Sequence, residues 1–265
     1  MAFREQFSRM EGGALIPIFI ATGHSGSGKS TLLSVAREAY QNYGLFPETI
    51  TDRNLLSQAV AEDMMRGFSE VEVSPGKQAR VSEHAILYRD HDEPGLRVFT
   101  VRDGVLLNDV HRRMRDIICD NPNEQGLVIE WTTGPNVEVF PVLPTGGEGL
   151  YQDAESFLRL FSERSLDEDR RVLVIAVNAD LEFRVARNLR RPDPMEPSDF
   201  ARIFRDGGEL RAAHLQQFSE RFVFKEYSNN YDNERRFFRE MNHLCGRELS
   251  SLIEGNRPNP ERRDG

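Results

Sequence analysis

The apolar positions along the chain alternate between short runs typical of buried β-strands and longer stretches with a helical period. The short runs predict strands at 16–22, 48–52, 126–132, 171–177 and 221–227. Between and after them, the pattern predicts helices at 29–41, 54–66, 105–119, 151–164, 181–190, 198–217 and 233–253. Strands that alternate with helices indicate βαβ units, so we predict an α/β fold, a three-layer sandwich around a mostly parallel five-stranded sheet.

One segment departs from this alternation. Two β-rich runs within 78–102 flank the polar turn DHDEPG, which predicts a small β excursion inserted into the fold. The tail 254–265 is rich in Pro, Asn and charge, and we expect it and residues 1–14 to be disordered. Residues 15–253 are then predicted to form a single domain.

The composition narrows the class of protein. With 38% hydrophobic and 29% charged residues among 265, the chain is typical of a globular protein. Its net charge of −9 argues against a general affinity for nucleic acid. No apolar run approaches the roughly 20 residues of a membrane span, and the first residues lack a secretory signal, so we expect a cytoplasmic protein. Cys119 and Cys245 lack metal-ligand spacing and are expected to be buried thiols.

The stretch GHSGSGKST joins the first predicted strand to the first predicted helix. Gly23, four intervening residues, and then Gly28, Lys29 and Ser30 match the spacing of a phosphate-binding loop. Glycines let the backbone approach anionic oxygens, and N–H groups at a helix N-terminus attract a polyphosphate. We expect Lys29 to reach the β and γ phosphates of ATP or GTP, and Ser30 to bind Mg²⁺. The residues expected to bind the nucleotide here are Gly23, Ser25, Gly26, Ser27, Gly28, Lys29, Ser30 and Thr31.

Carboxylates end two other predicted strands, where ligands of parallel sheets bind. Glu130 stands where phosphate-loop proteins usually place the acidic residue that serves Mg²⁺, and Asp52 ends the second strand. Either one could orient the acceptor, and the sequence leaves open which is catalytic. Trp131, next to Glu130, could stack on an acceptor or fill the core.

The segment 181–212 is expected to form a lid. Arg184, Arg187 and Arg191 recur at helical spacing and share one face of a short helix. Guanidinium groups there would stabilise the charge of a phosphoryl group in transfer, and a closed lid would exclude water. The alternative is a solvated basic helix paired with the carboxylates of this acidic chain.

Five segments follow one another along the chain: the phosphate loop, TDR at 51–53, IEWTTGP at 129–135, NADLEFRVARNLRR, and FKEYSNN before the last helix. In this order they resemble the nucleoside and nucleoside-monophosphate kinase group of phosphate-loop proteins, which includes adenylate, guanylate, cytidylate and dephospho-coenzyme A kinases. The resemblance covers about residues 15–253 and implies the phosphate-loop NTPase fold. It implies that Arg53 binds an acceptor phosphate and that Asn229 and Asn230 lie near the donor base. The run EWTTGPN lacks the arginine found at this place in adenylate kinases, which leaves the acceptor open.

The sequence therefore predicts a kinase that moves the γ-phosphoryl group of ATP, with Mg²⁺, to a small-molecule acceptor. Two alternatives remain. A nucleotidase acting as a regulatory switch would need segments ordered by the γ phosphate, and a kinase of polynucleotide ends would need a basic channel. The acceptor, the choice between ATP and GTP, and the oligomeric state are left open by the sequence.

Overall fold

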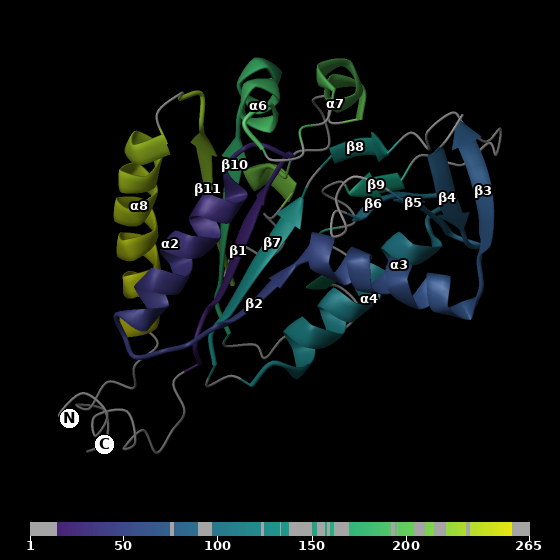
Figure 1. The fold of residues 1–265 in the computed structure, drawn as a ribbon. Helices are drawn as coiled ribbons and strands as arrows, with labels where there is room; N and C mark the ends of the chain where they lie inside the picture. The colour runs from purple at the N-terminus through teal and green to yellow at the C-terminus, as the bar shows by residue number, and fades with distance from the viewer. Residues whose placement is uncertain are drawn as a thin grey trace, which may run out of the picture.

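The centre of the molecule is a parallel sheet with the strand order β11-β10-β1-β7-β2 (Figure 1). The computed structural model describes residues 15–74, 77–89, 97–122, 125–132, 134–137, 150–152, 157, 160, 161, 170–191, 194, 196–203, 210–214, 221–231 and 234–255. The strands are β1 (Ile18–Gly23), β2 (Glu48–Thr51), β7 (Leu127–Thr132), β10 (Val172–Asn178) and β11 (Phe222–Ser228). All neighbouring pairs are parallel, which confirms the five strands expected from the apolar runs.

Helices cover both faces of this sheet (Figure 1). Phe19 and Ala21 face α2 (Lys29–Gln41) and α8 (Glu234–Gly255). Ile18 and Ile20 face the opposite way, toward α3 (Asp52–Arg66) and α4 (Val105–Asp120). Because successive side chains of a strand alternate between faces, an uninterrupted apolar run supplies both cores, and the three-layer α/β prediction is confirmed.

Two further helices follow β10, namely α6 (Leu181–Asn188) and α7 (Pro197–Ile203). Of the helix expected over 198–217, residues 198–203 are helical, residues 210 and 211 are not, and residues 212–214 form only a short turn of 3₁₀-helix. Of the helix expected at 151–164, the described residues are 151–152, which belong to a strand, and 157, 160 and 161, which are helical. At the other end of the chain, α8 continues to Gly255, two residues beyond the predicted boundary. Residues 1–14 and 256–265, expected to be disordered, lie outside the described part of the chain.

The inserted β excursion is larger than the sequence indicated. It is an antiparallel sheet of β3 (Ser69–Ser74), β4 (Lys77–Val81), β5 (Ala85–Arg89) and β6 (Arg97–Val101). The strand at 69–74 was not predicted because its two valines are separated by a glutamate and flanked by acidic and hydroxyl residues, so it lacks a buried apolar run. The expected turn DHDEPG lies entirely outside the described residues. Ala85 and Val101 belong to the same apolar core as residues of α3 and α4. This packing attaches the excursion to the main domain.

A smaller pair of strands, β8 (Gly134–Val137) and β9 (Leu150–Gln152), was also not predicted. It lies between the main sheet and the antiparallel sheet, below α7, in Figure 1. Among the described helices, none combines the length and apolar character that crossing a membrane requires.

The strand order identifies the edge of the sheet where a ligand would bind. From β1 the chain passes to β2 and β7 on one side, and later to β10 and β11 on the other. Connections therefore diverge at the carboxyl end of β1, and such a switch point is where open parallel sheets bind ligands. In Figure 1 this end points upward, beneath α6.

The opposite end of the sheet is held by a buried arginine. Arg170 is 2% exposed and precedes β10. Its guanidinium donates to the Ile16 carbonyl at 3.1 Å, the Asn121 carbonyl at 3.0 Å and the Gln125 carbonyl at 3.0 Å. Ile16 precedes β1, and Asn121 and Gln125 lie in the connection between α4 and β7, so one side chain satisfies backbone groups of two segments.

We expect Arg170→Met to lower the free energy of unfolding by about 3 kcal/mol or more, because buried carbonyls that lose their donor each cost about 1–3 kcal/mol. Urea unfolding followed by circular dichroism measures the change. Arg171→Met is the matched control, since the Arg171 side chain is exposed. An equal effect of the two substitutions would contradict the role given to Arg170.

Candidate functional site

The glycine-rich stretch forms a tight loop at the carboxyl end of β1. Gly23 has φ of +139°, and a Cβ there would stand 2.1 Å from the Val177 carbonyl oxygen of β10. At Gly26, with φ of +80°, a Cβ would stand 3.1 Å from the backbone oxygen of Arg184. Only glycine fits both the backbone conformation and the close approach at Gly23. The loop is therefore pressed against β10 and α6.

The loop ends at the first turn of α2. No side chain caps this helix, and its first turn contains no acidic residue. Backbone N–H groups at such a terminus have no partner within the helix and carry the positive end of its dipole. They are thus available to an anion enclosed by the loop.

Lys29 lies inside this loop, with only 4% of its side chain exposed. Its Nζ donates to the His24 carbonyl oxygen at 2.9 Å and lies 3.8 Å from Oε1 of Glu130. Burial lowers the pKa of the ammonium, more than the nearby carboxylates of Glu130 and Asp52 raise it. The loop therefore holds a positive charge that its surroundings compensate only in part.

Glu130 reaches the loop from the neighbouring strand. In β7 it pairs with Ala21 of β1 on one side and Thr51 of β2 on the other. The Ser30 hydroxyl donates to its Oε2 at 3.4 Å. Burial raises the pKa of Glu130, and Lys29 opposes this shift. A hydroxyl and a carboxylate side by side offer the oxygen ligands that Mg²⁺ prefers, so these residues fit a magnesium ion.

Asp52 is fixed by hydrogen bonds at the start of α3. It is 5% exposed and accepts from the backbone N–H of Arg53 at 2.7 Å and of Thr132 at 2.6 Å. Burial raises the pKa of this carboxyl, while Lys29 and the Thr132 contacts lower it. Arg53 next to it is exposed. Thr132 was not singled out from the sequence, although it lies two residues beyond Glu130.

Trp131 lies on the other face of β7 from Glu130. It has no exposed surface and packs against His111, with ring centroids 4.9 Å apart, and against Phe157 at 5.9 Å. The ring therefore fills the core between β7 and α4. Because the Trp131 side chain has no exposed surface, a ligand bound at the surface would not contact it.

The three arginines expected to form the lid have different surroundings. Arg184 is fully buried, and its Nε donates to the Ala179 carbonyl at 2.9 Å. Arg187 donates to the carbonyls of Gly26 at 3.0 Å and Tyr231 at 2.9 Å, and so ties the loop to the segment after β11. The Arg191 side chain is exposed, and its positive charge favours a lower pKa at both Lys29 and Glu130. Of the three, only Arg191 is exposed enough to move toward a ligand without leaving a buried position.

The two asparagines after β11 also bind the protein. Asn229 is 3% exposed, and its side-chain amide donates to the Ser27 carbonyl at 2.6 Å. Asn230 exchanges two hydrogen bonds with Asp180, at 2.9 and 2.8 Å. Both amides thus hold the segment after β11 against neighbouring parts of the site, and their position near the donor base stays a prediction.

Two hydroxyls at the loop are buried without a hydrogen-bond partner in the described part of the chain, Thr22 Oγ1 and Ser27 Oγ. Buried polar atoms without partners are uncommon and mark a place where a polar ligand or water would be bound. Among the described residues there is no cluster of three or more His, Cys, Asp or Glu able to hold a metal ion.

Comparison with known proteins gives a likeness of fold only. No protein-family model matches the chain, and no curated protein matches it. A sugar kinase from Janibacter is 11% identical over 90% of this chain and 95% of its own, with a TM-score of 0.39. Shikimate kinase from Acinetobacter baumannii, solved with shikimate, is 12% identical over 93% of this chain and 97% of its own, with a TM-score of 0.38. At this level of similarity, function has to be inferred from the site itself.

The buried carboxyl of Glu130 predicts a difference in pH dependence. Because its folded pKa is raised, the folded protein holds this proton more tightly than the unfolded chain, so stability is lost as pH rises from about 4.3 through the raised pKa. Glu130→Gln removes this component. We expect the free energy of unfolding of the variant, relative to the unaltered protein, to increase between pH 4 and pH 7 in urea titrations. A difference that does not depend on pH would contradict the burial of an ionisable group there.

Proposed function

We propose that the protein is a kinase that transfers the γ-phosphoryl group of ATP to a small-molecule acceptor. The observation that carries the proposal is the position of Lys29, a buried ammonium within a glycine loop, 3.8 Å from a carboxylate and next to an uncapped helix. A triphosphate would supply the negative charge that this loop lacks. GTP would satisfy the same contacts, since the loop touches phosphates and not the base.

The donor would lie with its β and γ phosphates against the N–H groups of the loop and the ammonium of Lys29. Ser30 and Glu130 would hold Mg²⁺, which would supply positive charge to neutralise that of the phosphates. The contact between the Ser30 hydroxyl and Glu130 supports Glu130 as the residue that serves the metal.

Asp52 would then act on the acceptor. Its carboxylate is held in place by the N–H groups of Arg53 and Thr132 at the carboxyl end of β2, so it needs no reorganisation during the reaction. It would accept the proton of an acceptor hydroxyl while the acceptor oxygen forms a bond to the γ phosphorus. The bond from that phosphorus to the bridging oxygen breaks, and ADP leaves. Its raised pKa makes it a stronger base than an exposed aspartate.

The acceptor would lie on the side of β7 where α3 and the antiparallel sheet stand. Arg53, exposed beside Asp52, would contact an acceptor phosphate if the acceptor carries one. Nucleosides and nucleotides are the first acceptors to test, because the order of the motifs resembles the kinases of those compounds. Arg191 would approach the transferring group, while Arg187 keeps the loop in shape.

Mass spectrometry of a mixed pool tests this proposal. Nucleosides, nucleotides, sugars and other small metabolites are incubated with the protein, ATP and Mg²⁺, with Lys29→Ala as the control. We expect a product heavier by one phosphoryl group, and a loss of at least about a hundredfold in rate for Lys29→Ala with unchanged circular dichroism. Release of ADP and free phosphate alone, at a rate that no compound in the pool increases, would instead favour a nucleotidase.

Conservative substitutions separate the two carboxylates. Glu130→Gln should raise the Mg²⁺ concentration needed for half-maximal rate about tenfold, because one charged oxygen near the metal is lost. Asp52→Asn should lower kcat by about a hundredfold or more at saturating Mg²⁺, because the acceptor loses its base. Steady-state rates across a magnesium titration measure both. The opposite pattern would exchange the two roles.

A further inference from the structure

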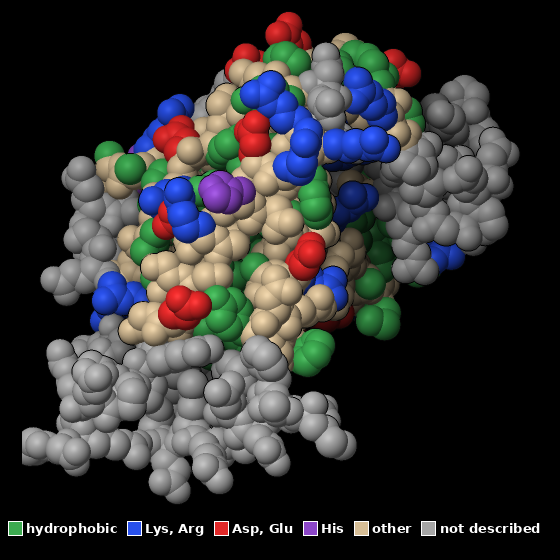
Figure 2. Space-filling model, turned by 90° about the vertical axis from the view of Figure 1, so that its left-hand side faces the viewer, with side chains coloured by type: hydrophobic (Ala, Val, Ile, Leu, Met, Phe, Trp, Pro, Cys, Tyr) green, Lys and Arg blue, Asp and Glu red, His purple; other side chains and the backbone are tan. Residues whose placement is uncertain are grey.

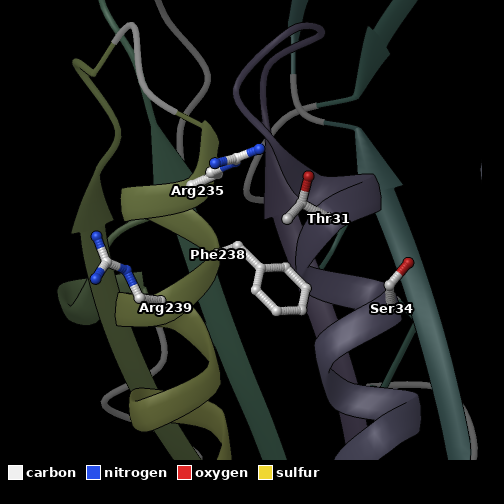
Figure 3. A pocket seen from close by; sticks show the side chains of 5 residues that line it. All are labelled: Thr31, Ser34, Arg235, Phe238 and Arg239. Atoms are coloured by element: carbon white, nitrogen blue, oxygen red, sulfur yellow. The ribbon is translucent and has the colours of Figure 1, made fainter.

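A groove of about 800 Å³ lies between α2 and α8, next to the phosphate loop. Its lining residues are Thr31 and Ser34 of α2 and Arg235, Phe238 and Arg239 of α8. In Figure 3 the ring of Phe238 lies between the two helices, and Arg235 points from α8 toward Thr31. The volume suits a ligand of the size of a nucleoside, since small-molecule sites span about 300–1,000 Å³.

The groove is continuous with the phosphate loop. Thr31 follows Ser30 directly and lies in the first turn of α2, so the groove begins where the loop ends. A ligand whose phosphates fill the loop would enter the groove by extending past this turn. The alternative direction, toward the segment after β11, is occupied by Asn229, Asn230 and Arg187, which bind one another, the loop and Asp180.

Phe238 is not required by the core. The buried face of α8 is formed by Phe237, Met241, Cys245 and Leu249, whereas Phe238 is 37% exposed. An aromatic ring on the surface of a groove offers a flat face on which a base can stack. Thr31 and Ser34 add hydroxyls that both donate and accept hydrogen bonds.

The charge around the groove suits an anionic ligand. Figure 2, which views the molecule from the side of α8, shows Lys and Arg side chains gathered at the upper end of this face. Exposed arginines lie in the first two turns of α8 and just after the end of α6, namely Arg235, Arg236 and Arg239, and Arg190 and Arg191. Two of them, Arg235 and Arg239, line the groove, so an anionic group bound there would lie beside two guanidinium groups.

We propose that this groove binds the nucleoside part of the donor nucleotide, with the base stacked on Phe238 and Arg235 beside the ribose and the α phosphate. The proposal rests on the proposed function, because it requires a nucleotide in the loop. It places the base against α8 and not against Asn229 and Asn230, as the resemblance to nucleotide kinases had implied.

Isothermal titration calorimetry with two probes tests the groove. ATP would occupy both the loop and the groove, whereas inorganic tripolyphosphate would occupy the loop alone. We expect Phe238→Ala to raise the Kd of ATP at least about fivefold, the lower end of the cost of losing one base–aromatic stack, and to leave the Kd of tripolyphosphate unchanged. Phe238→Trp should restore ATP binding. The control is Phe46→Ala, at a phenylalanine that is 80% exposed outside the groove and should change neither Kd.

The outcomes separate this proposal from the proposed function. If Phe238→Ala leaves the Kd of ATP unchanged, or weakens ATP and tripolyphosphate equally, the groove does not bind the base. The proposed function stands in that case, provided that ATP binds the unaltered protein and Lys29→Ala abolishes the binding. If the unaltered protein does not bind ATP, both proposals fail.

Discussion

Lys29 carries a positive charge into the interior of a loop, where burial disfavours that charge and lowers its pKa. A carbonyl oxygen at 2.9 Å and a carboxylate oxygen at 3.8 Å are the contacts that stabilise it. The residues around the loop keep this ammonium close to the backbone N–H groups at the start of α2. Glycines bring the loop against β10, and Arg187 and Asn229 bind its outward carbonyls, which leaves its inner surface for an anion.

The alternation of side chains along β7 divides the tasks around this charge. Glu130 faces α2 and contacts Ser30, whereas its neighbour Trp131 faces α4 and fills the core. At Thr132 the backbone N–H fixes Asp52 at the end of the adjacent strand. One strand end thus positions the Glu130 carboxylate beside the Ser30 hydroxyl, fills the opposite core with Trp131 and orients the Asp52 carboxylate.

The parallel sheet and the phosphate loop could be predicted because both depend on local sequence. Uninterrupted apolar runs report strands buried on both faces, and the spacing from Gly23 to Ser30 reports a backbone conformation. The contacts of Arg184 and Arg187 could not be predicted. Helical spacing predicted one shared helix face for Arg184, Arg187 and Arg191, but α6 ends at Asn188, so Arg191 lies beyond it. Whether a guanidinium meets a carbonyl or a ligand depends on the loop packed against it. The strand at 69–74 lacked a signal because it is exposed, and the groove beside Phe238 depends on packing between α2 and α8, far apart in sequence.

The affinity of the protein for a graded set of nucleotides, measured by calorimetry with Mg²⁺, tests the role of Lys29 most directly. The account predicts that ATP and ADP bind and that AMP binds at least about a hundredfold more weakly, because it lacks the β phosphate that the loop and Lys29 would hold, and hydrogen bonds to charged groups contribute about 1.5–3 kcal/mol each. Lys29→Met should reduce this preference at least about tenfold, because the ammonium is lost while the backbone N–H groups remain. Equal affinities for AMP and ATP, or a preference that Lys29→Met leaves unchanged, would contradict the account.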